Sequence, residues 1–442
     1  MTAAYALRPK VVDFEGTWRG LEESINRIIN LQSIDRHVWD DCFHDIYSLC
    51  VAIPDPLSEQ LYLRTRHCLE AHVRRLYQIV SASQEVDLLS GYYNHWQVYH
   101  KGATFIHNLF GYLNKQFIKS RRQAESDLQY GPSALPADRD CQMMEIGELA
   151  LSIWNQLMVT PLEAELVRQL LLAITADRNG DSTANVDVVK GVIMSFVQVE
   201  EFSSRQAEGE QLSLYKKVFE EKFLTATSDH YQAEASRLLA ECTVSQYMEK
   251  VIQRIDDENM RSRKFLHSSS FEKVTKMCQE VMVSAHKDRL YAVCREMVHN
   301  ESKIDLKNMY TLLKPIVQGL TVLIKEFEQH VKKSGLDGVQ NLKGDNVPQQ
   351  FVENILAVHH KFNALVAEVF SDDGDFVGAL DKALQSAVNF KEESRSCPKA
   401  SEWVRYCWRS FVGSGGPVGM YVPIVVTVVN VVTVAAPALR HR

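Results

Sequence analysis

Histidines, cysteines and acidic residues are the side chains that could bind a metal or move protons, and the 442-residue chain has 15, 9 and 56 of them. The string DRNGD at 177–181 is the nearest to a calcium loop, but its glycine comes two positions early and no glutamate stands at the twelfth position. His359 and His360 are adjacent and point in different directions on a helix, while His67 and His72 are five residues apart and fit one helical face poorly. We therefore expect no metal ion.

Motifs that bind phosphates or carry nucleophiles are also missing from the sequence. It contains no GxGxxG, GxxxxGK[S/T], HExxH, GxSxG or CxxC. Acids and lysines are interspersed, so no carboxylate pair stands out as a general acid and base. The formal net charge of −7 lacks the positive field that nucleic acids select. We predict no enzyme, no cofactor and no nucleic-acid partner; an enzyme with an unfamiliar helical site stays an open alternative.

The cysteines and the N-terminus indicate the compartment. The nine cysteines are scattered and never closer than eight residues, which suits neither a disulfide framework nor a zinc site. The first 18 residues have no apolar core of the length that a secretory signal needs. Reduced thiols in a cytoplasmic or nuclear protein are the expected state.

The apolar pattern predicts an all-α chain. From Phe14 to about Cys407 apolar residues recur at helical spacing, and almost no segment alternates as a half-buried strand requires. The segments 145–158 and 162–174 show broad apolar faces that must pack on several neighbours. Turn-forming residues predict breaks between helices at 53–59, 130–140, 177–185, 332–338 and 343–349.

Two of these helices carry unusual surfaces. In 38–52 the apolar arc, which includes Trp39, Phe43 and Tyr47, exceeds the roughly 100° that core packing uses, so part of it should remain exposed. Packing of the surplus on a neighbouring helix is the open alternative to a partner surface. The second helix, 105–119, is expected to group its polar and aromatic residues opposite Phe110, Leu113 and Phe117; these residues are Tyr112, Lys115, Gln116 and Lys119.

These segments also resemble the first repeat of the cullin family, and further motifs follow in the family's order and spacing. The resemblance covers about residues 8–407. The motifs that carry it are VVDFEGTW at 11–18, WDDCFHDIYSLCVAIPDPL at 39–57, GYLNKQFIK at 111–119, QYGPSALP followed by MEIGELAL, EASRLL at 234–239, SQYMEKVIQRIDDENMRSRKFLH at 245–267, DLKNMYTLL at 305–313 and FVGALDKALQSAVN at 376–389.

The resemblance implies an elongated, curved stalk of three stacked five-helix cullin repeats. In a ubiquitin ligase, the far tip of such a stalk holds a substrate-receptor module. The domains expected here are an N-terminal tail at 1–13, an adaptor-binding repeat at 14–135, repeats at 140–268 and 270–407, and a non-cullin apolar tail at 408–442.

By the same resemblance, the module is Elongin B and Elongin C with a receptor that carries a matching box. Its binding helices map to 38–52 and 105–119, and the N-terminal tail through Val11 is expected to touch the adaptor. The residues implied are Trp39, Phe43, Tyr47 and Val51 as apolar anchors, His44 at the rim, Tyr112, Asn114 and Lys115 in the second helix, and Ala52, Ile53 and Pro54 where the family discriminates among receptors.

The function expected is that of a noncatalytic scaffold of a cullin-RING ubiquitin ligase, in the cytoplasm and nucleus and monomeric before assembly. A membrane-tethering helical rod is the alternative from another class.

The likeness to cullins stops after residues 406–408. No segment resembles the RING-partner site or the lysine motif that accepts the ubiquitin-like modifier, so we expect the chain to be inactive as a ligase by itself. Residues 418–439 are uncharged and carry nine valines. Translation in an unintended frame is the favoured account of this tail, ahead of a membrane anchor and of an unrecognised packing element.

Overall fold

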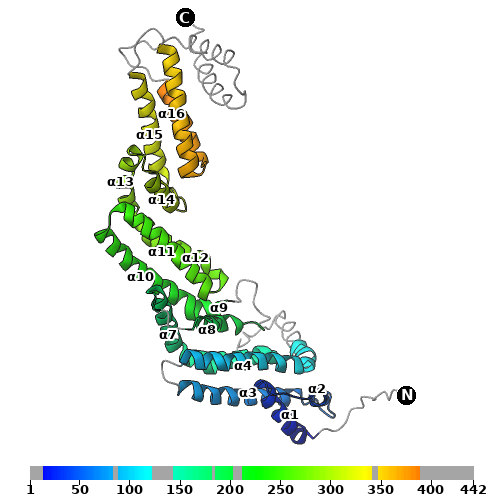
Figure 1. The fold of residues 1–442 in the computed structure, drawn as a ribbon. Helices are drawn as coiled ribbons and strands as arrows, with labels where there is room; N and C mark the ends of the chain where they lie inside the picture. The colour runs from blue at the N-terminus through cyan, green and yellow to red at the C-terminus, as the bar shows by residue number, and fades with distance from the viewer. Residues whose placement is uncertain are drawn as a thin grey trace, which may run out of the picture. The chain divides into compact units, whose positions relative to one another are not determined.

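The computed structural model describes residues 13–82, 88–121, 143–181, 185–202, 212–340 and 347–388. Every regular element in these ranges is a helix, so the prediction of an all-α chain is confirmed (Figure 1). Contacts divide the chain into two compact units: unit 1 comprises residues 1–227 and 260–274, and unit 2 comprises residues 228–259 and 275–442. The division into three repeats stays a prediction. Residues 1–12 of the expected N-terminal tail and the whole expected tail at 408–442 lie outside the described residues.

Unit 1 begins with long helices joined by short turns. They are α1 (Phe14–Ile29), α2 (Arg36–Cys50), α3 (Ser58–Ser81), α4 (Leu88–Leu109) and the π-helical turn η2 (Leu113–Ile118). Helix α1 contacts α2, α3 and α4, and α2 also contacts α3, α4 and η2. Gly102 on α4 allows a close approach to α1, because a Cβ atom there would lie 2.7 Å from the backbone of Ile29.

The rest of unit 1 consists of α6 (Ile146–Trp154), η4 (Asn155–Val159), α7 (Thr160–Arg178), α8 (Val186–Gln198), α9 (Ser213–Tyr215), η5 (Lys216–Glu220), the start of α10 (Glu221–Glu241), the end of α11 (Val244–Phe265), η6 (Ser268–Ser270) and the start of α12 (Phe271–Met282). Of these, α6, η4, α7 and α8 pack on α3 or α4, and α9 and η5 follow on α8 and α7. Helices therefore occupy both broad apolar segments that the sequence singled out.

An aromatic cluster forms the centre of unit 1. The rings of Tyr99 and Trp154 stack with centroids 4.8 Å apart, and those of Trp96 and Trp154 lie 5.4 Å apart. Trp154 Nε1 donates to the Tyr92 hydroxyl at 3.2 Å, which lies 2.9 Å from Ser195 Oγ. These large side chains are almost fully buried with their polar atoms hydrogen-bonded, as a stable interior requires.

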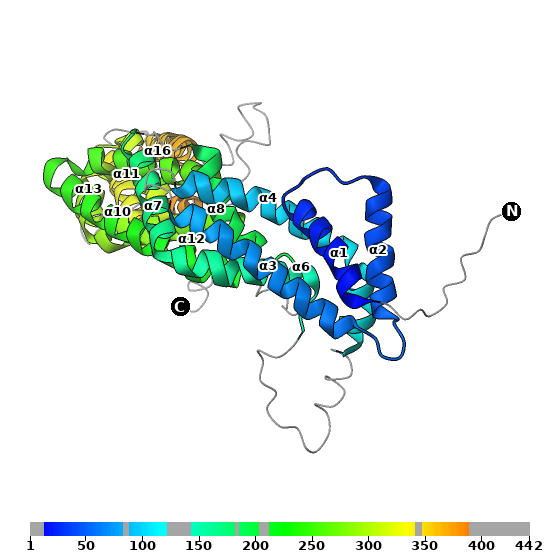
Figure 2. The same cartoon turned by 90° about the horizontal axis from the view of Figure 1, so that it is seen from below.

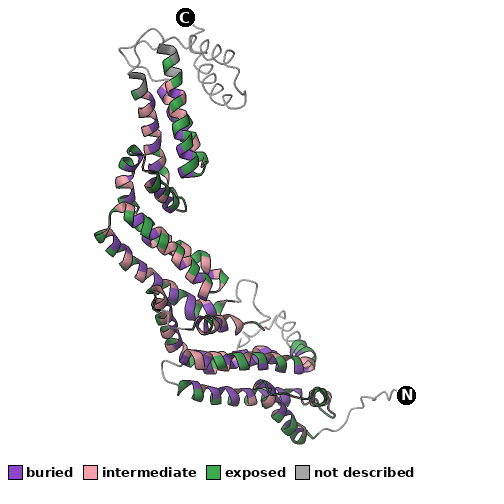
Figure 3. Cartoon of the chain, viewed as in Figure 1, coloured by how far each residue is buried: buried purple, intermediate pink, exposed green. Residues whose placement is uncertain are grey.

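Unit 2 contains the remaining parts of α10, α11 and α12, followed by η7 (Ser284–His286), α13 (Lys287–His299), α14 (Lys303–Leu313), α15 (Thr321–Gln340), α16 (Val347–Phe370) and α17 (Gly374–Val388). Phe370 and Phe376 stack at 3.9 Å, and Phe327 packs edge-on against both. In Figure 3 the buried residues of the long helices run along one face of each helix and the exposed residues along the other. This arrangement is the amphipathic pattern on which the sequence prediction rested.

The predicted break at 332–338 is wrong, because α15 continues through it. Gly335 lies where α15 meets α17: a Cβ atom there would be 3.1 Å from that of Ala387 and 3.7 Å from Ile355 Cδ1. The glycine therefore permits close helix packing instead of ending the helix.

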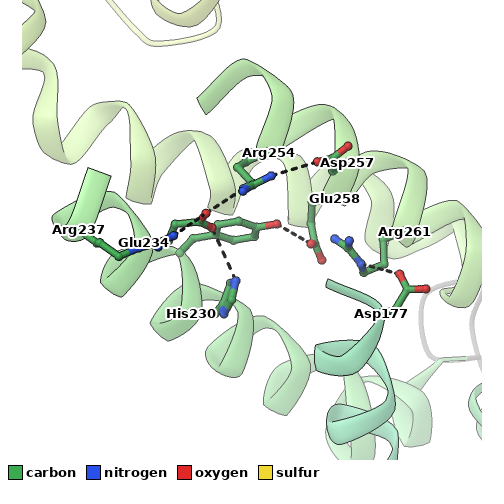
Figure 4. Close-up of polar contacts among 9 residues, drawn as sticks. Asp177, His230, Glu234, Arg237, Arg254, Asp257, Glu258 and Arg261 are labelled. Atoms are coloured by element: carbon green, nitrogen blue, oxygen red, sulfur yellow. Dashed lines mark hydrogen bonds and ion pairs between the residues drawn. The ribbon is translucent and has the colours of Figure 1, made fainter. Parts of the chain in front are cut away.

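Ion pairs join helices within each unit (Figure 4). In unit 1, Asp177, from the string that resembled a calcium loop, accepts a hydrogen bond from Arg261 at 3.0 Å and pairs with Lys264. In unit 2, Arg254 on α11 pairs with Glu234 on α10 at 2.8 Å, and Tyr231 donates a hydrogen bond to the buried Glu258 at 2.7 Å. None of the described helices combines the length with the apolar composition that a membrane span requires.

Candidate functional site

Helix α2 shows the partly exposed apolar arc that its sequence predicts. Cys42, Ile46 and Leu49 face inward and are buried, whereas Phe43 is 45% exposed. Trp39 and Tyr47 are half-buried. Figure 2 shows α2 beside α1, with its outer side not covered by another described helix. The neighbouring helices thus account for only part of the surplus apolar surface.

The turn after α2 extends this surface. Leu57 N–H donates to Leu49 C=O at 3.0 Å, which closes the turn. Ile53 is 49% exposed at its tip and Pro54 is also exposed, whereas Ala52 is 5% exposed. The side chain of Ala52 therefore lies in the interior, and the expectation that it contacts a receptor does not fit its position.

The second segment differs from the single helix predicted at 105–119. Helix α4 ends at Leu109, Phe110 lies in a turn, and the chain then forms the π-helical turn η2. Its faces nevertheless agree with the prediction. Phe110 and Leu113 are buried and Phe117 is half-buried, and the exposed positions are Lys115, Gln116 and Lys119.

Tyr112 joins the two segments. Its ring meets that of Tyr47 edge-on, with centroids 4.8 Å apart, and both residues are half-buried. We define the tip surface as the exposed parts of Trp39, Phe43, Tyr47, Ile53 and Tyr112 with the rim residues His44, Val51, Pro54 and Lys115. The structure thus brings together most of the residues that the sequence proposed.

Asn114 does not belong to the tip surface, and its expected role as a contact residue is wrong for its position. It is 2% exposed, its Oδ1 accepts a hydrogen bond from Ile146 N–H at 2.9 Å, and its Nδ2 donates to His107 C=O at 3.2 Å. The polar atoms of the Asn114 side chain therefore form hydrogen bonds within unit 1.

The charges around the tip surface are divided between its two segments. Helix α2 contributes Asp40, Asp41 and Asp45, while Lys115 and Lys119 come from the second segment. Burial raises the pKa of the Asp45 carboxyl above its ordinary value, although His44 opposes this. The tip surface therefore has carboxylates on one of its segments and ammonium groups on the other.

Exposed apolar residues on α4 were not singled out from the sequence. Val98 and Phe105 are 37% and 50% exposed. They are seven residues apart, a spacing that places them on one helical face and that could have identified them.

Each unit consists of packed helices, an arrangement typical of helical-repeat (α-solenoid) proteins. The chain matches the model of the cullin family, described as "Cullin alpha solenoid domain", over residues 18–407. This match covers more than half of the chain, and the chain belongs to the cullin family.

Individual relatives agree with this assignment. The chain is 48% identical to Cullin-2 of Caenorhabditis elegans over 410 residues, which cover 90% of the chain and 51% of that protein. It is 30% identical to Cullin-1 of Dictyostelium discoideum over 399 residues, covering 86% of the chain and 50% of that protein. Cullin-5 of the same organism is 26% identical over 392 residues, covering 87% and 49%. The chain spans about half the length of these relatives, and its likeness to the N-terminal region of a cullin-2 type is confirmed.

Proposed function

We propose that the chain is a noncatalytic scaffold of a cullin-RING ubiquitin ligase and that its tip surface binds Elongin C, in complex with Elongin B and a box-containing receptor. Membership of the cullin family supports the scaffold role, and the identity to a Cullin-2 supports this choice of adaptor. The observation that carries the proposal is the 45% exposure of Phe43 on a helix whose opposite face is buried.

The scaffold acts by fixing the positions of the proteins that it binds. A protein that holds a bound substrate near a conjugating enzyme raises their effective concentration without contributing a catalytic group. The packed helices hold the tip surface in one geometry, and Phe43, Tyr47 and Ile53 lose water when the adaptor covers them. Cytoplasm and nucleus are the compartments in which this proposal places the complex.

In this proposal, the turn at 52–54 determines which receptors bind. Ile53 and Pro54 are exposed there, next to the adaptor-binding helix, so a receptor held by the adaptor meets them at the edge of the tip surface. Ala52 acts only through the shape of the turn, because its side chain is buried.

A binding titration tests the proposal. The 442-residue chain is titrated with purified Elongin B–Elongin C, with and without a box-containing receptor. We expect saturable binding that weakens in Phe43→Ala and not in Leu172→Ala. Leu172 on α7 is a matched control because it is 55% exposed, in the same unit, and outside the tip surface. A folded chain that does not bind the pair would refute the adaptor assignment.

A further inference from the structure

The side chain of Asn114 ties the second segment of the tip surface to the start of α6. Ile146 is the first residue of α6, and Glu145 before it makes no side-chain cap for the helix. The first N–H groups of a helix have no partner within the helix. Asn114 Oδ1 accepts the one from Ile146 at 2.9 Å, although the two residues are 32 positions apart in the sequence. Asn114 therefore acts as a cap supplied by another element.

Two further contacts fix the same corner of unit 1. Lys119 Nζ lies 3.4 Å from Glu145 Oε1, and Glu145 is only 8% exposed. A Cβ atom on Gly147 would lie 2.7 Å from His107 Nδ1, so the first turn of α6 lies close against α4. The segment 111–119 is thereby held by hydrogen bonds and an ion pair to α4 and to the start of α6, which do not belong to the tip surface.

Asn114 lies within the π-helical turn, between two residues of the tip surface. Tyr112 meets Tyr47 and Lys115 is exposed, whereas Asn114 between them is buried. A π-helical turn contains an extra residue compared with α-helix, and such turns occur often at functional sites. Return to α-helical geometry would rotate the residues that follow by about 100°. Lys115 and Lys119 would then leave their present positions.

We propose that Asn114 is a positioning residue for the tip surface: by capping α6 it keeps η2 in its π-helical form, with Tyr112 against Tyr47 and Lys115 outward. This inference rests on the proposed adaptor binding. Asn114 itself is 2% exposed and touches no partner, so any effect of its substitution on binding acts through the residues it holds.

The test compares Asn114→Ala with Tyr99→Phe in the full chain. Tyr99 OH donates to Ala150 C=O, also in α6, at 2.8 Å, so Tyr99→Phe removes a buried hydrogen bond to α6 without touching 111–119. Asn114→Ala loses the two hydrogen bonds that hold η2, so fewer molecules keep the binding geometry, and we expect binding of Elongin B–Elongin C to weaken about tenfold. We expect unchanged affinity in Tyr99→Phe. Asn114→Ser keeps an uncharged oxygen that can accept from Ile146 N–H, so it should weaken binding less than Asn114→Ala does, and it serves as the second variant if Asn114→Ala does not fold.

Amide hydrogen exchange supplies the readout that separates position from general stability. The Ile146 amide and residues 111–121 should exchange faster in Asn114→Ala and not in Tyr99→Phe. Equal affinity of Asn114→Ala and the wild-type chain, or an equal loss in Tyr99→Phe, overturns the positioning role alone. A wild-type chain that does not bind Elongin B–Elongin C overturns the proposed function, and this role falls with it.

Discussion

Replacing Phe43 with alanine removes the most exposed aromatic side chain of the tip surface. A phenylalanine has about 200 Å² of surface, so its 45% exposure leaves about 90 Å² for an adaptor to cover. At about 25 cal/mol per Å², covering this area contributes about 2 kcal/mol. Phe43→Ala should therefore weaken adaptor binding about 30-fold. The inward face of α2, made by Cys42, Ile46 and Leu49, stays unchanged, so the variant should fold as the wild-type chain does.

Isothermal titration of Elongin B–Elongin C into each variant measures this effect, and thermal unfolding checks the fold. Leu172→Ala removes a side chain of similar exposure from α7 and should bind as the wild type does. An affinity of Phe43→Ala within about twofold of wild type would refute the reasoning, because the worked burial energy would then be absent.

Three further predictions concern the stability of unit 1. Burial, with Arg75 and His95 adding to it, lowers the pKa of His72 from 6.5 to about 4. The folded state thus favours the neutral ring. It contributes up to about 3 kcal/mol to the free energy of unfolding above pH 6.5, and this contribution is lost as the pH falls toward 4. Denaturant unfolding at pH 7 and pH 4.5 measures the loss. Gly102→Ala places a Cβ atom 2.7 Å from the Ile29 backbone and should cost about 1 to 3 kcal/mol in the same assay. Lys273→Met removes the ammonium 2.6 Å from the buried Glu220 carboxylate and should cost about 2 kcal/mol, of which Glu220→Gln in the double variant should restore most.

Each of these predictions has a control. His72→Gln lacks the titrating ring and should lose less stability between pH 7 and pH 4.5 than the wild type; equal losses would contradict the assignment to His72. Gly20→Ala is the match for Gly102→Ala, because nothing lies within 4 Å of its Cβ position, and it should be neutral or slightly stabilising. If the double variant with Glu220→Gln and Lys273→Met is no more stable than Lys273→Met alone, the buried carboxylate is not the cause of the stability loss.

The sequence predicted the tip surface where the information was local. An apolar arc wider than core packing uses already implied that part of α2 stays exposed, and Phe43 does. The faces of 111–119 followed in the same way from residue type, since Leu113 is buried and Lys115 is exposed. Such patterns depend only on residues three or four positions apart.

Contacts between distant segments could not be predicted in this way. Asn114 is polar and precedes Lys115, so nothing local distinguishes it from a surface residue; its burial depends on Ile146, 32 residues further on. Gly335 suggested a helix break because only its local sequence was considered. Its contact with Ala387 on α17 shows why α15 continues. In both cases packing between elements, and not local propensity, determined the structure around the residue.

Hydroxyl-radical footprinting of Phe43 tests the central claim most directly, because it reports whether water reaches that ring. The free chain should be labelled at Phe43, which is 45% exposed. Addition of saturating Elongin B–Elongin C should protect Phe43 strongly while labelling of Leu172 stays the same. Full labelling of Phe43 in a chain that has bound the adaptor would contradict the account, because the adaptor would then bind elsewhere.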